Sequence, residues 1–318
     1  MTANRNIKVT IMIPTYNQAR YIREAIDSAL AQTYVNLEVI VGDDASTDTT
    51  PEIVGEINDP RLRYIRNSKN IGRTGNYKNL LYNHATGDYV VNLDGDDYYT
   101  DPDFISEAVK LIAPGKNLVM IVARATTKTT DKQCVSLIPK YQSVIGMQIL
   151  RNLPASKYFI MHMTVMYARQ SALKIDFYRS PVISSDWESL YRLSLLGTVQ
   201  YLNRNVGVWR IHDSNETGTT DPAKQLENLT IWPVIYKDAV AFGMNAILAK
   251  FICARCIAFF IQSSCEKISM DNNAVLVKFI MDVYSKYKFA TFLLILTPVY
   301  TSRVLLSLTG YYRRKRLL

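Results

Sequence analysis

Cysteine and histidine are scarce in this sequence, and their scarcity excludes several kinds of protein. The 318 residues include four cysteines and three histidines. Cys134 stands alone, whereas Cys253, Cys256 and Cys265 fall within an apolar stretch near the C-terminus, which is not the pattern of a disulfide framework. Because no second pair with zinc-ligand spacing follows Cys253 and Cys256, we expect these thiols to pack inside a helical core.

Long apolar runs are also lacking. The first six residues are polar and the apolar stretch 7–13 has only the length of a strand, so we expect no secretory signal and a cytoplasmic protein. Near the C-terminus, fourteen uncharged residues lie between Lys288 and Arg303 and are interrupted by Pro298. Because a bilayer core needs about twenty apolar residues, we expect no membrane span there.

Negative charge is sparse in the last quarter of the chain. The net charge is +9, and the sequence from residue 241 onward contains eleven Lys or Arg but three Asp or Glu. Lys286, Lys288 and the cluster Arg313-Arg-Lys-Arg316 flank the uncharged run 289–302, which fits an interfacial segment attracted to anionic lipids. We therefore expect peripheral attachment to the cytoplasmic membrane face. Packing of this region on the domain, or on a second subunit of a homo-oligomer, stays open.

The remaining composition is that of a globular protein, with 48% hydrophobic and 20% charged residues. Hydrophobic periodicity predicts strands at 7–13, 37–41, 62–66 and 89–93, alternating with helices at 19–32, 51–57 and 77–86. This alternation predicts an α/β fold with a mainly parallel sheet flanked by helices. We expect two halves, 1–100 and 101–220, followed by a helical C-terminal region, 221–318.

Four polar loops directly follow the predicted strands. They are Pro14-Thr-Tyr-Asn17, Gly42-Asp-Asp44, Asn67-Ser-Lys-Asn-Ile-Gly72 and Asp94-Gly-Asp-Asp97. The carboxyl ends of parallel strands meet at one edge of a sheet, where ligands bind. We therefore expect a single binding site on this edge.

The fourth loop gathers carboxylates. Asp94 and Asp96 would project to the same side, because strand side chains alternate with a period of two, and together they could hold a hard divalent cation. Gly95 leaves room between them. A solvated acidic turn is the alternative, since Asp and Gly are common turn formers, but the three preceding polar loops favour a binding site.

These motifs resemble those of a known family. Val9-Thr-Ile-Met-Ile-Pro-Thr-Tyr-Asn17, Val39-Ile-Val-Gly-Asp-Asp-Ala-Ser-Thr-Asp48, Asn70-Ile-Gly72 and Gly87-Asp-Tyr-Val-Val-Asn-Leu-Asp-Gly-Asp-Asp97 are similar, in order and spacing, to the inverting family 2 glycosyltransferases of GT-A fold. The resemblance is strong over residues 7–105, moderate over 180–213 and slight over the last hundred residues.

The resemblance implies a nucleotide diphosphate-sugar donor, with UDP the commonest nucleotide. It assigns donor contacts to ten residues: Pro14, Thr15, Tyr16, Asp44, Lys69, Gly72, Arg73, Asp94, Gly95 and Arg210. In it, Asp44 hydrogen-bonds the base and Asp94 faces the ribose. Asp96 and His212, the latter in an Arg-x-His element, would hold Mn²⁺ or Mg²⁺, cations that favour hard oxygen ligands.

A catalytic base is implied by a second element. Ser184-Ser-Asp-Trp-Glu188 resembles the family's Glu-Asp segment, with Asp186 in the position of the base and Ser185 in place of the usual preceding acid. Such a base accepts the proton of the acceptor hydroxyl. Glu188 is an alternative candidate for the base. Asp186 could instead cap the N-terminus of a helix, a common position for Asp.

The resemblance, together with the basic C-terminal region, implies an inverting glycosyltransferase that uses a metal and acts on a glycan or a lipid-linked glycan of a bacterial-type surface polysaccharide. A sugar-nucleotide nucleotidylyltransferase would need a Gly-rich loop after the first strand, where Pro14-Thr-Tyr-Asn17 stands. A catalytically silent nucleotide- or carbohydrate-binding protein of the same fold stays open. No nucleic-acid-binding motif accompanies the basic residues, so we do not expect a nucleic acid as partner.

Overall fold

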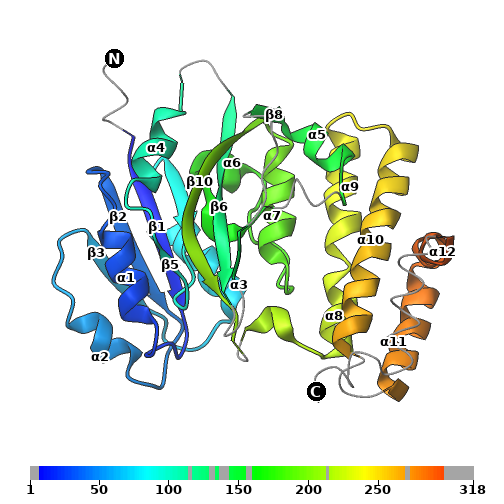
Figure 1. Ribbon diagram of the computed structural model, residues 1–318, viewed down its shortest axis with the longest axis horizontal. Coiled ribbons are helices and arrows are strands. Elements are labelled where there is room, and N and C mark those ends of the chain that lie inside the picture. The colour runs from blue at the N-terminus through cyan, green and yellow to red at the C-terminus, as the bar shows by residue number, and fades with distance from the viewer. Residues whose placement is uncertain are drawn as a thin grey trace. The chain divides into compact units, whose positions relative to one another are not determined.

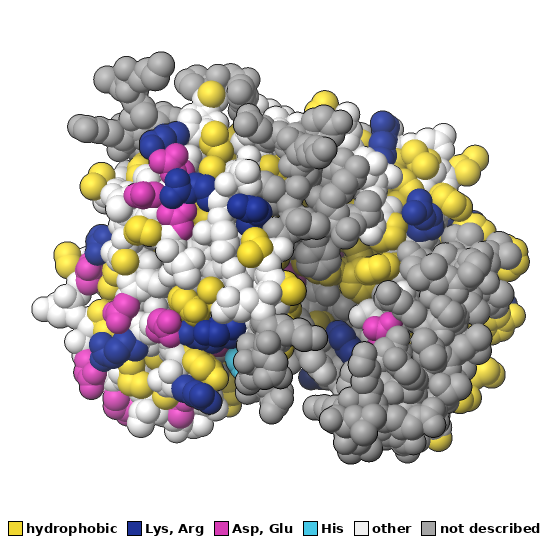
Figure 2. Space-filling model, in the orientation of Figure 1, with side chains coloured by type: hydrophobic (Ala, Val, Ile, Leu, Met, Phe, Trp, Pro, Cys, Tyr) yellow, Lys and Arg dark blue, Asp and Glu magenta, His cyan; other side chains and the backbone are white. Residues whose placement is uncertain are grey.

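The computed structural model of the chain describes residues 7–113, 117–128, 133–135, 143–154, 160–212, 215–268 and 273–296 (Figure 1); the side chains of the same view are coloured by type in Figure 2. Contacts divide the chain into two compact units. The first comprises 1–149, 156–181 and 189–212, and the second comprises 150–155, 182–188 and 213–318. The three-part division expected above, with boundaries after residues 100 and 220, stays a prediction.

The N-terminal part of the first unit alternates strands and helices, as predicted. Its elements are β1 (Val9–Thr15), α1 (Ile22–Leu30), β2 (Leu37–Asp43), α2 (Thr50–Gly55), β3 (Leu62–Arg66), α3 (Arg73–Asn79), η1 (Leu80–His84) and β4 (Tyr89–Asn92). β1 pairs in parallel with both β2 and β4, and β2 pairs in parallel with β3. Every residue of β1 and β2 is buried, as expected for central strands covered on both faces.

The rest of the first unit extends the same sheet. It contributes β5 (Tyr98–Tyr99), α4 (Phe104–Lys110), β6 (Leu118–Lys128), β7 (Gln133–Val135), β8 (Ser143–Ile145), α5 (Gly146–Arg151), η3 (His162–Thr164), β9 (Val165–Ala168), α6 (Arg169–Lys174) and β10 (Thr198–Arg210). The strand order is β3-β2-β1-β4-β9-β6-β10-β5, with β7 beside β6 and β8 beside β10. β9 runs antiparallel to both of its neighbours, whereas β6 and β10 are parallel. The predicted mixed, mainly parallel sheet flanked by helices is therefore confirmed.

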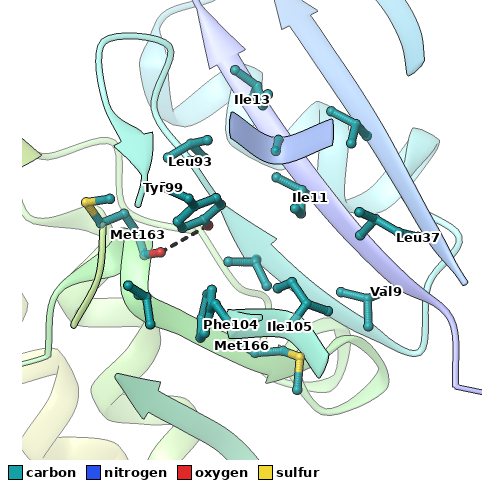
Figure 3. Close-up of a cluster of buried hydrophobic side chains, with 14 of the residues drawn as sticks. Val9, Ile11, Ile13, Leu37, Leu93, Tyr99, Phe104, Ile105, Met163 and Met166 are labelled. Carbon is teal, nitrogen blue, oxygen red and sulfur yellow. Dashed lines mark hydrogen bonds between the residues drawn. The ribbon is translucent and has the colours of Figure 1, made fainter. Parts of the chain in front are cut away.

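A hydrophobic core fixes the sheet edge that carries the loops. Val9, Ile11 and Ile13 point to one face of β1, since alternate strand residues share a face (Figure 3). They pack in a cluster with Leu93 and with Tyr99, whose hydroxyl donates to the carbonyl oxygen of Met163 at 3.1 Å (Figure 3). The cluster joins the strands to helices α1 and α4, so the loops that follow β1 and β4 start from a rigid base.

The second unit is helical. Besides the start of α7 (Ser185–Ser194), it contains η4 (Glu216–Gly218), α8 (Pro222–Asn228), α9 (Ile231–Ala241), α10 (Ala246–Ile268), α11 (Asn273–Lys286) and α12 (Lys288–Leu296). Cys256 is fully buried in α10, which confirms its predicted packing in a helical core, whereas Cys253 is only partly buried there. Burial raises the pKa of both thiols to about 12. The terminal cluster Arg313-Arg-Lys-Arg316 lies outside the described residues.

Within the described ranges, α10 alone is long and apolar enough to cross a membrane, judged by length and composition. Polar side chains in its C-terminal half, however, are bonded inside the second unit. Ser264 Oγ donates to Gln225 Oε1 at 2.9 Å, and Lys267 Nζ donates to the Thr217 carbonyl oxygen at 2.7 Å. Its Phe260 ring packs on Trp232, with centroids 5.0 Å apart. These contacts are those of a core helix.

Candidate donor-binding site

The loops after β1 and β2 are joined by hydrogen bonds. Asn17, whose backbone φ is 53°, accepts a bond from the Thr47 amide at 2.8 Å and donates its own amide to Ser46 Oγ at 2.9 Å. The Ala19 amide donates to Asp48 Oδ2 at 3.0 Å. The two predicted loops therefore form one platform. Within it, Pro14 and Thr15 are buried and Tyr16 is 45% exposed.

Asp43 and Asp44, at the end of β2, have different partners. Asp43 Oδ1 accepts from the Ser46 amide at 2.8 Å, and Oδ2 accepts from the Tyr64 hydroxyl at 2.5 Å and lies 3.5 Å from Arg66 Nε. Asp44 accepts two bonds at 2.9 Å, from Asn67 Nδ2 and the Ile71 amide, both at Oδ1. Among the described residues, Asp44 Oδ2 has no hydrogen-bond partner, which leaves it available to a donor group.

The loop 67–72 carries the predicted donor residues Lys69 and Gly72 and leads into α3, whose first residue is the predicted donor residue Arg73. Lys69 is exposed. Gly72 adopts φ 80°, a conformation that side chains rarely take, and α3 begins directly after it, four residues earlier than predicted. The Arg73 guanidinium lies 5.7 Å from the centre of the Tyr77 ring. The loop that carries Lys69 and Gly72 is thus bonded to Asp44 through Asn67 and Ile71, and Arg73 follows it at the start of α3.

The loop after β4 packs directly on the β1 loop. The Gly95 amide donates to the Pro14 carbonyl oxygen at 3.2 Å, and a Cβ atom at Gly95 would lie 2.2 Å from Gln18 Oε1 and 2.8 Å from Thr15 Oγ1. Glycine is therefore required by the neighbouring loop, which is a different reason from the spacing of Asp94 and Asp96 that the sequence suggested. Asp94 itself accepts a bond from the Tyr77 hydroxyl at 2.6 Å.

Two carboxylates of this loop are buried close to one another. Burial, followed by the negative charge of Asp94, raises the pKa of Asp96. Burial, followed by the charges of Asp96 and Asp94, raises the pKa of Asp97 well above its usual value. The protein surroundings of this loop therefore disfavour the charged forms of both carboxylates.

His212 and Arg210, just after and at the end of β10, reach the same loop. His212 Nε2 lies 2.9 Å from Asp96 Oδ2, and the ring stacks on Tyr21 with centroids 5.3 Å apart. The Arg210 amide donates to Asp97 Oδ1 at 2.9 Å. The structure thus brings together Asp96 and His212, the two predicted metal ligands.

The Arg210 guanidinium already has several partners. It donates to the Asp96 carbonyl oxygen at 2.7 Å, pairs with Glu24 of α1, and lies 4.3 Å from the centre of the Tyr98 ring. A contact with a donor diphosphate, as the resemblance implies, would have to compete with Glu24. That role of Arg210 stays a prediction.

Tyr21, Glu24 and Tyr77 were not singled out from the sequence. Glu24 and Tyr77 lie on helices and Tyr21 directly precedes α1, so their contacts with the site depend on how these helices pack on the sheet. No sequence signal marked Tyr77; the structure shows it, because a tyrosine that is 1% exposed needs a partner for its hydroxyl, and Asp94 supplies that partner.

The described part of the chain contains no group of three or more His, Cys, Asp or Glu side chains arranged to hold a metal ion. The pair Asp96 and His212 nevertheless offers one oxygen and one nitrogen ligand, and Asp94 has a second carboxylate oxygen that does not bond to Tyr77. The raised pKa of Asp96 agrees with a place for a cation. The chemistry of this donor set fits a divalent ion.

Asp186 lies in the first turn of α7, within the second unit. It is partly exposed, and its carboxylate makes no hydrogen bond to the residues that the structure describes; Glu188 is fully buried. The segment before Asp186 is fixed by Asn228 of α8, which accepts from the Ser184 amide at 2.8 Å and donates to Ser184 Oγ at 3.1 Å.

Comparison with known proteins gives a family match over residues 10–175, described as glycosyl transferase family 2. Uncharacterized proteins of Mycobacterium bovis and Mycobacterium tuberculosis are 34% identical over 212 residues, which cover 64% of this chain and 59% of theirs. The hyaluronan synthase of Pasteurella multocida is 32% identical over 203 residues, 63% of this chain and 20% of its own length. The chain thus spans less than two thirds of these relatives.

Solved structures support the fold. Staphylococcus aureus TarS residues 1–349, in complex with UDP-GlcNAc, is 15% identical with a TM-score of 0.61, covering 98% of this chain and 91% of that one. The mannosyltransferase PcManGT from Pyrobaculum calidifontis, in complex with GDP-Man and Mn²⁺, is 18% identical with a TM-score of 0.57, covering 99% and 89%. At these identities the similarity shows the fold alone.

Proposed function

The chain belongs to glycosyltransferase family 2, with a GT-A-like fold, and from that premise we propose that it transfers the sugar of a UDP-sugar to a hydroxyl group of a glycan or lipid-linked glycan, with inversion by a single displacement. Transfer from a nucleotide-sugar is the activity of the family. One observation carries the proposal. The loops after β1, β2 and β4 are bonded into one site that contains the open oxygen of Asp44 and the pair Asp96 and His212.

The donor nucleotide is proposed to lie along the platform of the β1 and β2 loops. Tyr16 is exposed there and offers a flat ring to a base, and Asp44 Oδ2 offers an acceptor to a base N–H group. Asn67 and the Ile71 amide hold the other oxygen of Asp44, so the carboxylate is oriented before the donor arrives. UDP is preferred because uracil presents one such N–H and because the structurally similar TarS was solved with UDP-GlcNAc.

Asp96 and His212, with Asp94, are the residues that would hold Mn²⁺ or Mg²⁺, and the structurally similar PcManGT was solved with Mn²⁺. When bound, such a cation neutralises charge on the departing diphosphate. The protein's own part is to orient the ligands. Tyr21 stacks on the His212 ring, and Tyr77 fixes one oxygen of Asp94.

Asp186 is proposed as the base that accepts the proton of the acceptor hydroxyl as the new bond to the anomeric carbon forms. Its carboxylate is partly exposed and is not occupied by capping, whereas the Glu188 side chain is fully buried. We expect Asp186→Asn to lower turnover by about 10³-fold while UDP affinity stays unchanged. Loss of turnover in Glu188→Gln, at normal stability and with Asp186→Asn active, would instead assign the base to Glu188.

The acceptor is proposed from the curated relatives, which include a hyaluronan synthase and chondroitin synthases. A growing polysaccharide or its lipid-linked precursor presents the hydroxyl that the reaction requires. A catalytically silent protein of the same fold is the competing possibility, and nucleotide binding without turnover would reveal it.

The first experiment is calorimetric titration of the protein with UDP, GDP, dTDP and CMP, each with Mn²⁺ and with EDTA. We expect binding of UDP that requires Mn²⁺ and that Asp96→Asn abolishes. Asp27→Asn, on the exposed side of α1, is the matched control and should bind normally. Binding of another nucleotide alone would correct the donor, and binding of none would refute the proposed site.

A further inference from the structure

Exposed apolar side chains are concentrated in the helical unit. Among the described residues, eighteen large hydrophobic side chains are exposed; seven belong to the first unit, where they lie on separate elements, and eleven belong to the second. Five of the eleven fall within twelve residues, at the end of α9 and the start of α10. They are Val240, Phe242, Ile247, Leu248 and Phe251, with exposed fractions of 39, 51, 81, 39 and 42%. We name this set the α9–α10 tip.

The turn that carries the α9–α10 tip is well ordered by its own bonds. Asn245 Oδ1 accepts from the amides of Ile247 at 3.0 Å and Leu248 at 3.1 Å, which caps α10. Gly243 adopts φ 97°, and the Met244 side chain is buried. The hydrogen bonds of this turn therefore fix the backbone that presents the exposed apolar side chains to solvent.

Positive charge surrounds the α9–α10 tip. Lys237, Lys250 and Arg255 are all exposed, and Asp238 is the sole acid between residues 231 and 263. Ile247, Phe251 and Arg255 follow one another at four-residue spacing and so share one side of α10; the Arg255 guanidinium lies 5.9 Å from the centre of the Phe251 ring. On the face seen in Figure 2, hydrophobic side chains gather with Lys and Arg side chains where Figure 1 draws α9 and α10.

We propose that the α9–α10 tip is a docking surface for a bilayer that contains anionic phospholipids. Exposed apolar side chains at the end of a helix pair insert between head groups, while adjacent Lys and Arg side chains pair with lipid phosphates. A second copy of the chain fits less well, because a two-fold contact through the tip would bring Lys250 and Arg255 against their own counterparts. This inference is independent of the proposed reaction.

The surface can be tested with the full-length protein and vesicles. We expect the protein to float with vesicles of phosphatidylcholine and phosphatidylglycerol, to bind phosphatidylcholine alone at least tenfold more weakly, and to be released by salt. The double variant Ile247→Ser, Phe251→Ser should lose at least tenfold in affinity, because it removes the inserting side chains. Lys250→Glu, Arg255→Glu should lose a similar factor on anionic vesicles only.

The matched control is Val35→Ser. Val35 is 83% exposed, like Ile247 at 81%, but lies in the first unit, so vesicle binding should not change. Equal binding of the wild type and the double variant would overturn the proposal. The proposal would also be overturned if light scattering without lipid detected a concentration-dependent dimer and the double variant abolished that dimer. UDP titration of the same variants separates this outcome from failure of the donor site, because their UDP affinity should remain normal.

Discussion

The ends of β2 and β4 both carry adjacent aspartates at the same edge of the sheet, yet their surroundings differ. Asp43, after β2, is buried with an amide, a tyrosine hydroxyl and an arginine as partners. Asp96 and Asp97, after β4, are buried close to one another and to Asp94, and burial raises the pKa of both. The first cluster is satisfied by the protein, whereas in the second the protein disfavours the charged carboxylates, which a bound cation would favour.

From this difference we predict that Asp43 stabilises the fold and that the aspartates after β4 serve the proposed reaction. Buried carboxylates with a raised pKa lower the free energy of unfolding. Their position in a loop next to the binding platform is therefore explained by a role in binding or reaction and not by stability. Neutralising a carboxylate should therefore have opposite effects at the two strand ends.

The largest expected effect is that of Asp96→Asn. We expect turnover to fall by about 10³-fold or more, because a ligand for the cation and its charge are lost. The free energy of unfolding should stay the same or rise, since the raised pKa shows that the folded state disfavours the charged form. UDP release from a UDP-sugar and urea unfolding measure the two quantities. Destabilisation with normal turnover would reverse the roles assigned to the two clusters.

Asp43→Asn should show the reverse behaviour. Asp43 is fully buried and accepts two hydrogen bonds besides its pairing with Arg66, so we expect the free energy of unfolding to fall by about 2 kcal/mol. Turnover of the folded fraction should change little. Urea unfolding beside the exposed control Asp27→Asn gives the measurement, and an unchanged midpoint would contradict it.

Tyr77→Phe tests how the β4 cluster is held. It removes the hydroxyl that donates to Asp94 at 2.6 Å and keeps the buried ring. We expect Mn²⁺ affinity in the presence of UDP to fall about tenfold, as is usual when a residue that orients a ligand is lost. Tyr82→Phe, on the next turn of the same helical segment, is the matched control. If Mn²⁺ affinity is equal in both variants, Asp94 does not need Tyr77.

Much of this site was predictable from the sequence, because strand ends are marked by apolar runs that stop at polar motifs. The loops at 14–17, 42–44 and 94–97 were placed on one edge by the strand-helix alternation alone, and the structure joins them. The reason for Gly95 was not predictable, since it depends on Thr15 and Gln18 of another loop. The full length of β10 was not predictable either, because polar Asn203, Arg204 and Asn205 interrupt its apolar pattern.

Glu24→Gln has the smallest expected effect and decides the role of Arg210. In the structure the Arg210 guanidinium pairs with Glu24 while it lies over Tyr98. If Arg210 contacts the donor diphosphate, removing the charge of Glu24 releases it, and UDP should bind about two- to threefold more tightly, the scale of an exposed ion pair. Glu56→Gln is the matched control, since Glu56 pairs with Arg23 of the same helix. Unchanged or weaker UDP binding in Glu24→Gln would mean that Arg210 has a structural role and links α1 to the β4 loop. The donor site would then consist of the open oxygen of Asp44 and the pair Asp96 and His212, without Arg210.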